Sequence, residues 1–217
     1  MFFAIEGVIG VGKTSLARLL QPSFKAQCLL EVFEENPFLS NFYQDRTRFA
    51  FQTQIFFLLS RYHQQHSNVP ELLVGGQPLI SDYTFDKDSL FARINLSGDE
   101  LEMYQRVHQA LAEKIPQPEV VVYLRASSDV LMQRITQRDR SYERAMERDY
   151  IDTLNQAYDA FYLAPEKSNT TLVIETNGLD FVHQPDDLAW VDNRIRQTLH
   201  LPPFQPELPL PKRKQTD

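Results

Sequence analysis

The chain has 217 residues, 42% of them hydrophobic and 24% charged, so it can bury a core of its own and wholesale disorder is excluded. Its formal net charge of −7 argues against binding to a nucleic-acid backbone, and its single cysteine, Cys28, excludes a disulfide framework and a cysteine-built zinc site. It has neither the roughly 18-residue apolar run of a membrane span nor the basic start of a signal peptide, so we expect a cytoplasmic protein with no membrane partner.

Short apolar runs alternate along the chain with longer helical patterns. The runs expected to be strands are 2–6, 28–33, 78–82, 120–124 and 171–175. The segments expected to be helices are 13–20, 48–66, 98–115, 127–136, 149–163 and 186–199. Because the strand runs are apolar throughout, both faces of each strand are expected to be covered. This alternation predicts an α/β fold, a five-stranded parallel sheet with helices on both faces.

The C-terminal end differs in composition from the rest of the chain. Five of the 13 prolines lie at positions 202, 203, 206, 209 and 211. Proline at this density forbids a helix and favours an extended path. We therefore expect one domain over residues 1–201, followed by a proline-rich tail over residues 202–217.

The first predicted strand leads into a glycine-rich segment that matches the phosphate-loop pattern in full, Gly7-Val8-Ile9-Gly10-Val11-Gly12-Lys13-Thr14. Glycines allow backbone N–H groups to curl around phosphate oxygens, and the following helix presents its positive end. Lys13 is expected to reach the outer phosphates, and the Thr14 hydroxyl to ligate Mg²⁺. The segment predicts a nucleoside triphosphate site, which Ser15 extends. The absence of any Asn-Lys dipeptide argues against a switch GTPase.

Further motifs follow in an order that resembles the deoxynucleoside kinase family, particularly its bacterial deoxyguanosine and deoxyadenosine kinases. The segments that carry the resemblance are Asn36-Pro37-Phe38-Leu39, Phe42-Tyr43, Phe51-Gln52-Thr53, Ser81-Asp82-Tyr83, the arginine-rich stretch from Arg134, and Leu179-Asp180-Phe181-Val182. The resemblance covers about residues 1–200. It implies a P-loop kinase fold, ATP with Mg²⁺ as phosphate donor, a deoxynucleoside as acceptor, and a homodimer.

The segment after the second strand contains three carboxylates. By the resemblance, Glu31 aligns with the general base of the family, and a carboxylate there can take the proton of a sugar 5′-hydroxyl that attacks the γ-phosphate. Glu34 and Glu35 lie close by in the chain and are competing candidates. Their alternative role is that of acids at a solvated helix start, where they suit the helix dipole.

Three further residues are assigned to the acceptor by the same resemblance. Tyr43 aligns with a tyrosine that hydrogen-bonds the sugar 3′-hydroxyl, although it also suits aromatic packing. Gln52 aligns with the glutamine that reads the base edge, since an amide offers both a donor and an acceptor. Phe51 is expected to stack on or wall the base.

The third strand ends in Ser81-Asp82-Tyr83, where many family members have an acid followed by arginine. Asp82 keeps the acid, which is expected to help hold Mg²⁺. Tyr83 replaces the arginine, and our hypothesis is that Lys87 supplies part of the missing positive charge. Asp88 aligns with a position near the nucleobase; an acid there disfavours thymine but leaves guanine, adenine and cytosine open. Arg61 stays unassigned, because an arginine on a long helix is usually solvated.

Five of the 15 arginines lie between Arg134 and Arg148, in a segment that resembles the lid of the family. Planar guanidinium groups suit the charge on a phosphoryl group in transfer, and we assign Arg138 and Arg140 to catalysis and Arg134 and Arg138 to ATP. Glu143 aligns with an acid that touches the sugar 3′-hydroxyl when the lid closes. Asp139 stands where the family usually has glycine, and Phe181 is expected to pack near the ATP adenine.

These observations predict an ATP-dependent kinase of the deoxynucleoside 5′-hydroxyl, with purines favoured, deoxyguanosine first and deoxyadenosine second, in nucleotide salvage. The residues expected to carry the reaction are Glu31, Lys13, Asp82, Arg138 and Arg140. Two alternatives within the same chemistry are a nucleoside monophosphate kinase of the thymidylate kinase type and a kinase that prefers deoxycytidine or deoxyadenosine. A nucleotide-binding regulator without catalysis is the alternative from another class.

Overall fold

The computed structural model describes residues 1–164 and 170–204, apart from the side chain of Glu34. In those residues the strands form one parallel sheet in the order β2-β3-β1-β4-β5. The strands are β1 (Phe2–Glu6), β2 (Gln27–Leu29), β3 (Leu79–Ser81), β4 (Val120–Arg125) and β5 (Thr170–Glu175). The predicted tail lies outside the described residues from 205 onward.

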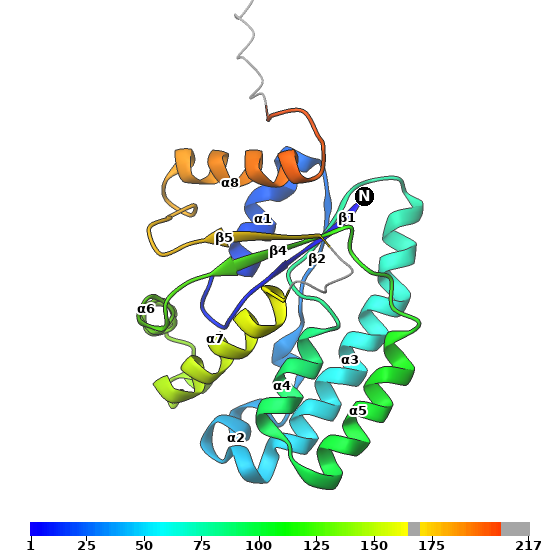
Figure 1. Ribbon diagram of the computed structural model, residues 1–217, viewed down its shortest axis with the longest axis vertical. Helices are drawn as coiled ribbons and strands as arrows, with labels where there is room; N and C mark the ends of the chain where they lie inside the picture. Colours follow the sequence, from blue (N-terminus) through cyan, green and yellow to red (C-terminus); the bar gives the residue numbers. More distant parts are fainter. Residues whose placement is uncertain (165–169, 205–217) are drawn as a thin grey trace, which may run out of the picture.

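Helices cover both faces of the sheet, as predicted. They are α1 (Lys13–Phe24), α2 (Leu39–Gln44), α3 (Arg46–Val74), α4 (Lys87–Asn95), α5 (Gly98–Ala112), α6 (Ser128–Arg138), α7 (Arg148–Tyr162) and α8 (Pro185–Thr198), with 3-10 turns η1 (Phe33–Glu35) and η2 (Ser141–Glu143). In Figure 1, α1 and α8 lie on one side of the sheet, whereas α3, α4, α5 and α7 lie on the other. No helix in the described part of the chain is long and apolar enough to cross a membrane.

The structure corrects several element boundaries. Strand β2 ends at Leu29, four residues before the predicted end, so Glu31 lies on the connection beyond the strand. Helices α2 and α4 were not predicted, because α2 is short and α4 begins with polar residues that resemble a loop. Strand β5 alternates between buried and exposed residues, because an edge strand has a neighbour on one side only and is less covered.

A buried ion pair within the last helix, α8, connects this helix to α1 through Ser23 and Phe24. Arg196 Nε donates to Asp192 Oδ1 at 2.5 Å, and its Nη2 donates to the Ser23 carbonyl at 2.7 Å. The Ser23 hydroxyl donates to the other carboxylate oxygen of Asp192. The guanidinium also lies over the ring of Phe24, 4.4 Å from its centroid. Asp192 is 3% exposed, so its charge is balanced by these partners rather than by water.

Replacing Asp192 with alanine should lower the free energy of unfolding by about 3 kcal/mol, because it leaves the Arg196 charge buried without a partner. For a domain of this size the melting temperature should fall by about 6–12 °C. Thermal denaturation followed by circular dichroism measures this. Asp186→Ala, an exposed change in the first turn of the same helix, is the matched control and should change stability by less than about 1 kcal/mol. Equal losses in the two variants would contradict the assigned role of the pair.

Candidate active site

The phosphate loop lies at the carboxyl end of the central strand β1, where it turns directly into α1. Gly10 and Gly12 have φ angles of +89° and +106°, in the region that glycine adopts without strain. A Cβ atom on Gly12 would lie 2.9 Å from Cζ of Phe181, so only glycine allows the loop to approach this ring. The loop therefore has the curled backbone that phosphate binding requires.

Lys13 is folded back onto this loop. Its Nζ donates to the carbonyls of Gly7 at 2.7 Å and Val8 at 3.2 Å. Burial and the nearby positive charge of Lys87 lower the pKa of Lys13 to about 8, against the opposing effect of neighbouring carboxylates. The lysine is thus poised to exchange two backbone acceptors for phosphate oxygens.

One cavity extends from the outer side of the loop. Three segments line it: the loop itself, α6 and the connection after β5. Its lining residues are Gly10, Val11, Gly12, Ser15, Val130, Gln133, Arg134, Gln137, Arg138, Asn177, Leu179, Asp180, Phe181, Val182 and His183. Arg134 donates to the carbonyls of Val11, Thr176 and Leu179 at 2.8–3.3 Å, so its guanidinium joins the three walls. Phe181 is buried against the loop.

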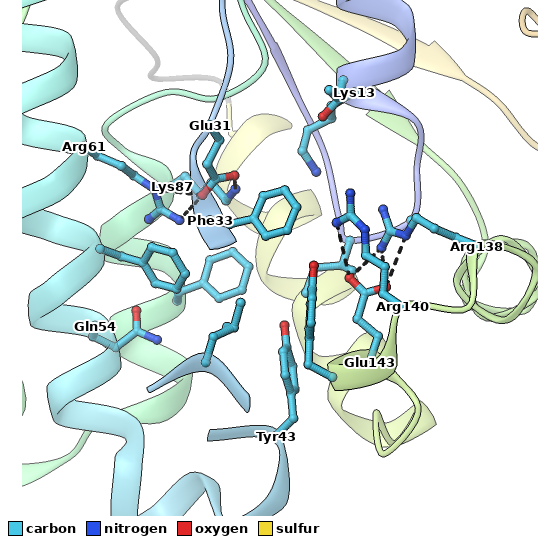
Figure 2. Close-up of a pocket in the computed structure, with 17 residues that line it drawn as sticks. Lys13, Glu31, Phe33, Tyr43, Gln54, Arg61, Lys87, Arg138, Arg140 and Glu143 are labelled. Atoms are coloured by element: carbon cyan, nitrogen blue, oxygen red, sulfur yellow. Dashed lines mark hydrogen bonds and ion pairs between the residues drawn. The ribbon is translucent and has the colours of Figure 1, made fainter. Parts of the chain in front are cut away.

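A second cavity lies on the other side of the loop, and Figure 2 shows the side chains that surround it. Its lining residues are Ile9, Gly10, Lys13, Thr14, Glu31, Phe33, Leu39, Tyr43, Gln54, Phe57, Arg61, Lys87, Phe91, Arg138, Arg140, Tyr142 and Glu143. Gly10 and Arg138 line both cavities, so the two spaces adjoin at the phosphate loop and the lid. After the roles proposed for them below, the cavity beside α6 is termed the donor cavity and the one that contains Glu31 the acceptor cavity.

Glu31 lies in the acceptor cavity within a cluster of four charged side chains. Arg61 donates to Glu31 Oε1 through Nε at 3.0 Å and also through Nη2, and Lys87 Nζ donates to Oε2 at 2.6 Å. Arg61 also pairs with Asp88, which is fully buried. Burial alone would raise the pKa of Glu31, but Arg61 and Lys87 hold it well below its usual range. Glu31 is therefore ionised, and Arg61 and Lys87 offset its charge.

Asp82 is buried beneath this cluster and joins two predicted site residues. It accepts a hydrogen bond from the Thr14 hydroxyl and, at 2.7 Å, one from the backbone N–H of Glu31. A hydroxyl beside a carboxylate fits Mg²⁺, which usually binds one or two protein oxygens together with phosphates and water. Among the described residues no group of three or more His, Cys, Asp or Glu side chains could hold a metal by itself. A cation here would depend on the nucleotide for its remaining ligands.

The lid arginines are held by the acid that the lid itself carries. Arg138 donates to both carboxylate oxygens of Glu143 at 2.6–3.1 Å, and Arg140 lies 3.7 Å from the same group. Asp139, which replaces the glycine of the family, has a φ of +48° at the end of α6. Its carboxylate forms two hydrogen bonds with Arg144, at 2.7 and 2.8 Å, which fasten the turn of the lid.

The prediction for Gln52 and Phe51 is corrected by the geometry of α3. Gln52 is exposed and Phe51 packs at the edge of the hydrophobic core, and neither lines the acceptor cavity. Gln54 lies there instead. It is 2% exposed, and its Oε1 has no hydrogen-bond partner among the described residues. Two positions along a helix are about 200° apart, so Gln52 and Gln54 face opposite sides.

The spacing along α3 would have revealed the cavity face. Gln54, Phe57 and Arg61 are three and four residues apart, so they form one stripe of the helix and all three line the cavity. None of these three was predicted from the sequence to lie in the site, and neither were Phe33, Phe91 and Tyr142, which also line it. Asp88, predicted to lie near the base, sits behind Arg61 and does not line either cavity.

Tyr83 and Glu35 lie outside both cavities. Tyr83 is fully buried in a small apolar cluster with Phe2 and Val69, and its hydroxyl donates to Gln64. It therefore leaves the positive charge beside Glu31 to Arg61 and Lys87. Glu35 is exposed and lines no cavity, whereas Glu31 does. The structure does not describe the side chain of Glu34, the other candidate base.

Comparisons with known proteins agree on one family. The family model for deoxynucleoside kinases matches residues 3–200. A deoxyguanosine kinase of Bacillus subtilis is 33% identical over 201 residues, which cover 91% of this chain and 97% of that protein. A deoxyadenosine kinase of Dictyostelium discoideum is 32% identical over 86% of this chain and 75% of its own length.

A solved structure of a deoxyadenosine kinase has the same fold. The deoxyadenosine kinase of M. mycoides, with the products dCMP and a flexible dCDP bound, superposes with a TM-score of 0.80. It is 25% identical, and the match covers 91% of this chain and all of that one. The predicted P-loop kinase fold is thus confirmed, and the chain belongs to the deoxynucleoside kinase family, whose members transfer a phosphoryl group between nucleotides and nucleosides.

Proposed function

We propose that this kinase transfers the γ-phosphoryl group of ATP to the 5′-hydroxyl of a purine deoxynucleoside, with deoxyguanosine preferred to deoxyadenosine, and that it serves nucleotide salvage. The observation that carries the proposal is the pair of adjoining cavities, with the Glu31 carboxylate on the acceptor side of their common boundary. The identity of 33% to a deoxyguanosine kinase over nearly its whole length favours deoxyguanosine as the first acceptor.

Glu31 is the proposed base. Its pKa is low in the absence of substrate because Arg61 and Lys87 offset the effect of burial, so it is ionised and orients the 5′-hydroxyl rather than removing its proton early. Phosphoryl transfer passes through a loose transition state, which requires little proton transfer before the phosphoryl group moves. Once Glu31 takes the proton it becomes neutral. The positive charges of Lys87 and Arg61 are then left beside the newly transferred phosphoryl group, where they stabilise it.

The remaining positive charges come from the phosphate loop and the lid, where the two cavities adjoin. Lys13 would leave its two carbonyl partners for the outer phosphates, and Arg138 and Arg140 would contact the phosphoryl oxygens that gain charge in the transition state. Thr14 and Asp82 would hold Mg²⁺, which neutralises phosphate charge when it is bound. Gly7 through Ser15, Arg134 and Phe181 are the proposed walls of the ATP site.

Gln54 is the proposed reader of the base edge, in place of Gln52. Its buried Oε1 lacks a partner, so it calls for a ligand with an N–H donor, as both guanine and adenine have. Asp88 does not contact the base in this proposal. It holds Arg61 in the wall of the cavity through an ion pair. Tyr43 and Glu143 line the cavity where the sugar would lie, and we assign both to its 3′-hydroxyl.

We also propose a homodimer, formed through the exposed sides of α3 and α5. Leu59 on α3 is 44% exposed and Met103 on α5 is 50% exposed, so each offers apolar surface to a second copy. Within the apolar stretch 56–59, Leu58 belongs to the core and Phe57 to the acceptor cavity, which leaves Phe56 and Leu59 for such a contact.

An acceptor panel tests the proposed reaction. ADP release with MgATP should be fastest with deoxyguanosine, slower with deoxyadenosine, and close to background with thymidine, with deoxynucleoside monophosphates and without acceptor. Deoxycytidine completes the panel. Glu31→Gln should lower turnover by about 100-fold or more, the usual effect of losing a general base, while ATP binding is kept. Turnover on monophosphates alone would refute the acceptor assignment, and a faster rate on deoxycytidine would refute the purine preference.

The corrected glutamine gives a second prediction. Gln54→Ala should raise the KM for the acceptor by about tenfold or more, because the base loses a buried hydrogen-bond partner. Gln52→Ala is the matched control on the same helix and should leave the KM unchanged, because its side chain is exposed. The reverse result, with Gln52 sensitive and Gln54 silent, would restore the alignment-based assignment.

The lowered pKa of Lys13 gives a third prediction. Below pH 8 the free enzyme carries a charged Lys13, whereas above pH 8 the free lysine is largely neutral and ATP must bind together with a proton. The dissociation constant for ATP should therefore rise by up to tenfold per pH unit above about pH 8. Calorimetry between pH 6.5 and 9.5, without acceptor, measures this slope. Lys13→Arg keeps its charge and should show a flat profile; equal slopes in the two proteins would contradict the prediction.

A further inference from the structure

The lid reaches the wall of the acceptor cavity through aromatic rings. Tyr142, in the turn η2 between Arg140 and Glu143, is half-buried and lines this cavity. Its ring stacks on that of Tyr43 from α2, with centroids 6.2 Å apart and planes inclined by 17°. It also lies 6.1 Å from the ring of Phe33, measured between centroids. These contacts join segments that are far apart in the chain.

A second lid residue, Arg140, contacts the same wall of the acceptor cavity. The guanidinium of Arg140 lies over Phe33, 4.3 Å from the ring centroid. Figure 2 shows Phe33 and Tyr43 on the side of the cavity that faces Arg140, Arg138 and Glu143 of the lid. Phe33 and Tyr43 thus form a fixed aromatic ledge on which the lid rests. Within the lid, Arg138 pairs with Glu143 and Arg144 pairs with Asp139, and Arg46 of α3 pairs with Glu147 at 2.6 Å.

The same short lid also borders the donor cavity. Arg138 lines both cavities, and only three residues separate it from Tyr142. A movement that lifts Tyr142 from Tyr43 would therefore also displace the arginine that faces the phosphates. Aromatic stacking is favourable and requires a defined geometry, so it ties the position of the lid to that of the ledge.

We propose that Tyr142 is a positioning residue of the acceptor site, carried by the lid, whose stacking on Tyr43 couples acceptor binding to lid closure over ATP. The inference rests on the proposed function, because it takes Tyr43 as part of the sugar site. An acceptor that orders Tyr43 favours the stacked, closed lid, and the closed lid presents Arg138 to the phosphates. By thermodynamic linkage, ATP must then tighten the binding of the acceptor by the same factor by which the acceptor tightens that of ATP.

If Tyr142 had only a structural role, its loss would have a different effect on the binding of acceptor and ATP. If Tyr142 only packs the lid, its loss lowers stability and changes binding of the two ligands independently, with no effect on their coupling. If Tyr142 couples the sites, its loss removes the mutual enhancement even in a variant that is fully folded. The coupling factor is therefore the readout that separates the two roles.

The experiment measures the dissociation constant of the deoxynucleoside with and without a non-hydrolysable ATP analogue plus Mg²⁺, by calorimetry. The probe is deoxyguanosine, or whichever deoxynucleoside the wild type turns over fastest. The wild type should bind it about fivefold more tightly or better when the analogue is present. Tyr142→Phe keeps the ring and should keep this factor. Tyr142→Leu should reduce it to about one, raise the acceptor KM about tenfold and increase acceptor-independent ATP hydrolysis relative to transfer.

Tyr62→Leu is the matched control. Tyr62 is also a half-buried tyrosine with a stacked ring, on His66 at 5.1 Å, but it lines neither cavity. Unchanged coupling in Tyr142→Leu, in a protein with wild-type turnover, would overturn the inference and leave the proposed function standing. Loss of coupling in Tyr142→Phe as well would overturn it too, since stacking would not be the cause. A wild type that neither binds nor phosphorylates any deoxynucleoside would instead refute the proposed function.

Tyr142→Ser provides a second test if the leucine variant does not fold. Thermal denaturation of each variant identifies this case, because a folded variant keeps a cooperative transition. The serine variant lacks the ring and keeps a hydroxyl at this half-buried position, so it should show the same loss of coupling. Coupling retained in a folded serine variant would overturn the inference in the same way.

Discussion

Arg61 bridges the half-buried carboxylate of Glu31 and the fully buried carboxylate of Asp88, and the acceptor side of the site depends on this bridge. Its guanidinium contacts Glu31 after β2 and Asp88 at the start of α4, while its own helix, α3, forms the wall of the cavity. Charges this deep must be paired, and removal of one partner typically costs about 3–5 kcal/mol. The bridge therefore fixes the spacing of three elements, and it places a charged carboxylate in the wall of the acceptor cavity.

Another buried carboxylate, Glu6, has a comparable role beside the phosphate loop. Glu6, the last residue of β1, accepts hydrogen bonds from the Gly7 N–H at 3.2 Å, the Thr84 N–H at 2.6 Å and the Tyr158 hydroxyl at 3.3 Å. It thereby ties the phosphate loop to the segment after β3 and to α7, the helix that follows the lid. Burial raises the pKa of Glu6, whereas the charges of Lys87 and Lys13 lower it. The net pKa of Glu6 is raised, and the two lysines proposed to act on phosphate limit this rise.

The contrast between the phosphate loop and the acceptor wall explains how far sequence could predict the site. The loop is contiguous, and its glycines, Lys13 and Thr14 act through local backbone geometry, so a pattern of eight residues identified it. The acceptor wall is assembled from helices far apart in the chain. Gln54 differs from Gln52 only in the helix face it occupies, and Arg61 reads as a solvated residue until Glu31 and Asp88 are placed beside it. The sheet was predicted because buried parallel strands are apolar throughout. Helix α4 was not, because it buries Lys87 and Asp88 in ion pairs that exist only in the folded chain.

The charged side chains of the lid are also arranged in pairs. In a chain with a net charge of −7, Arg138 is held by Glu143, and Arg144 is held by Asp139. Glu143 is buried and faces the acceptor cavity, so a sugar hydroxyl that donates to it competes with Arg138 for the same oxygens. In the proposed reaction, binding of the acceptor decides this competition. Entry of the acceptor would weaken the hold of Glu143 on Arg138 and so make the arginine available to the phosphates. Such an order favours transfer to the nucleoside over hydrolysis by water, because the charge that stabilises the phosphoryl group arrives together with the hydroxyl that receives it.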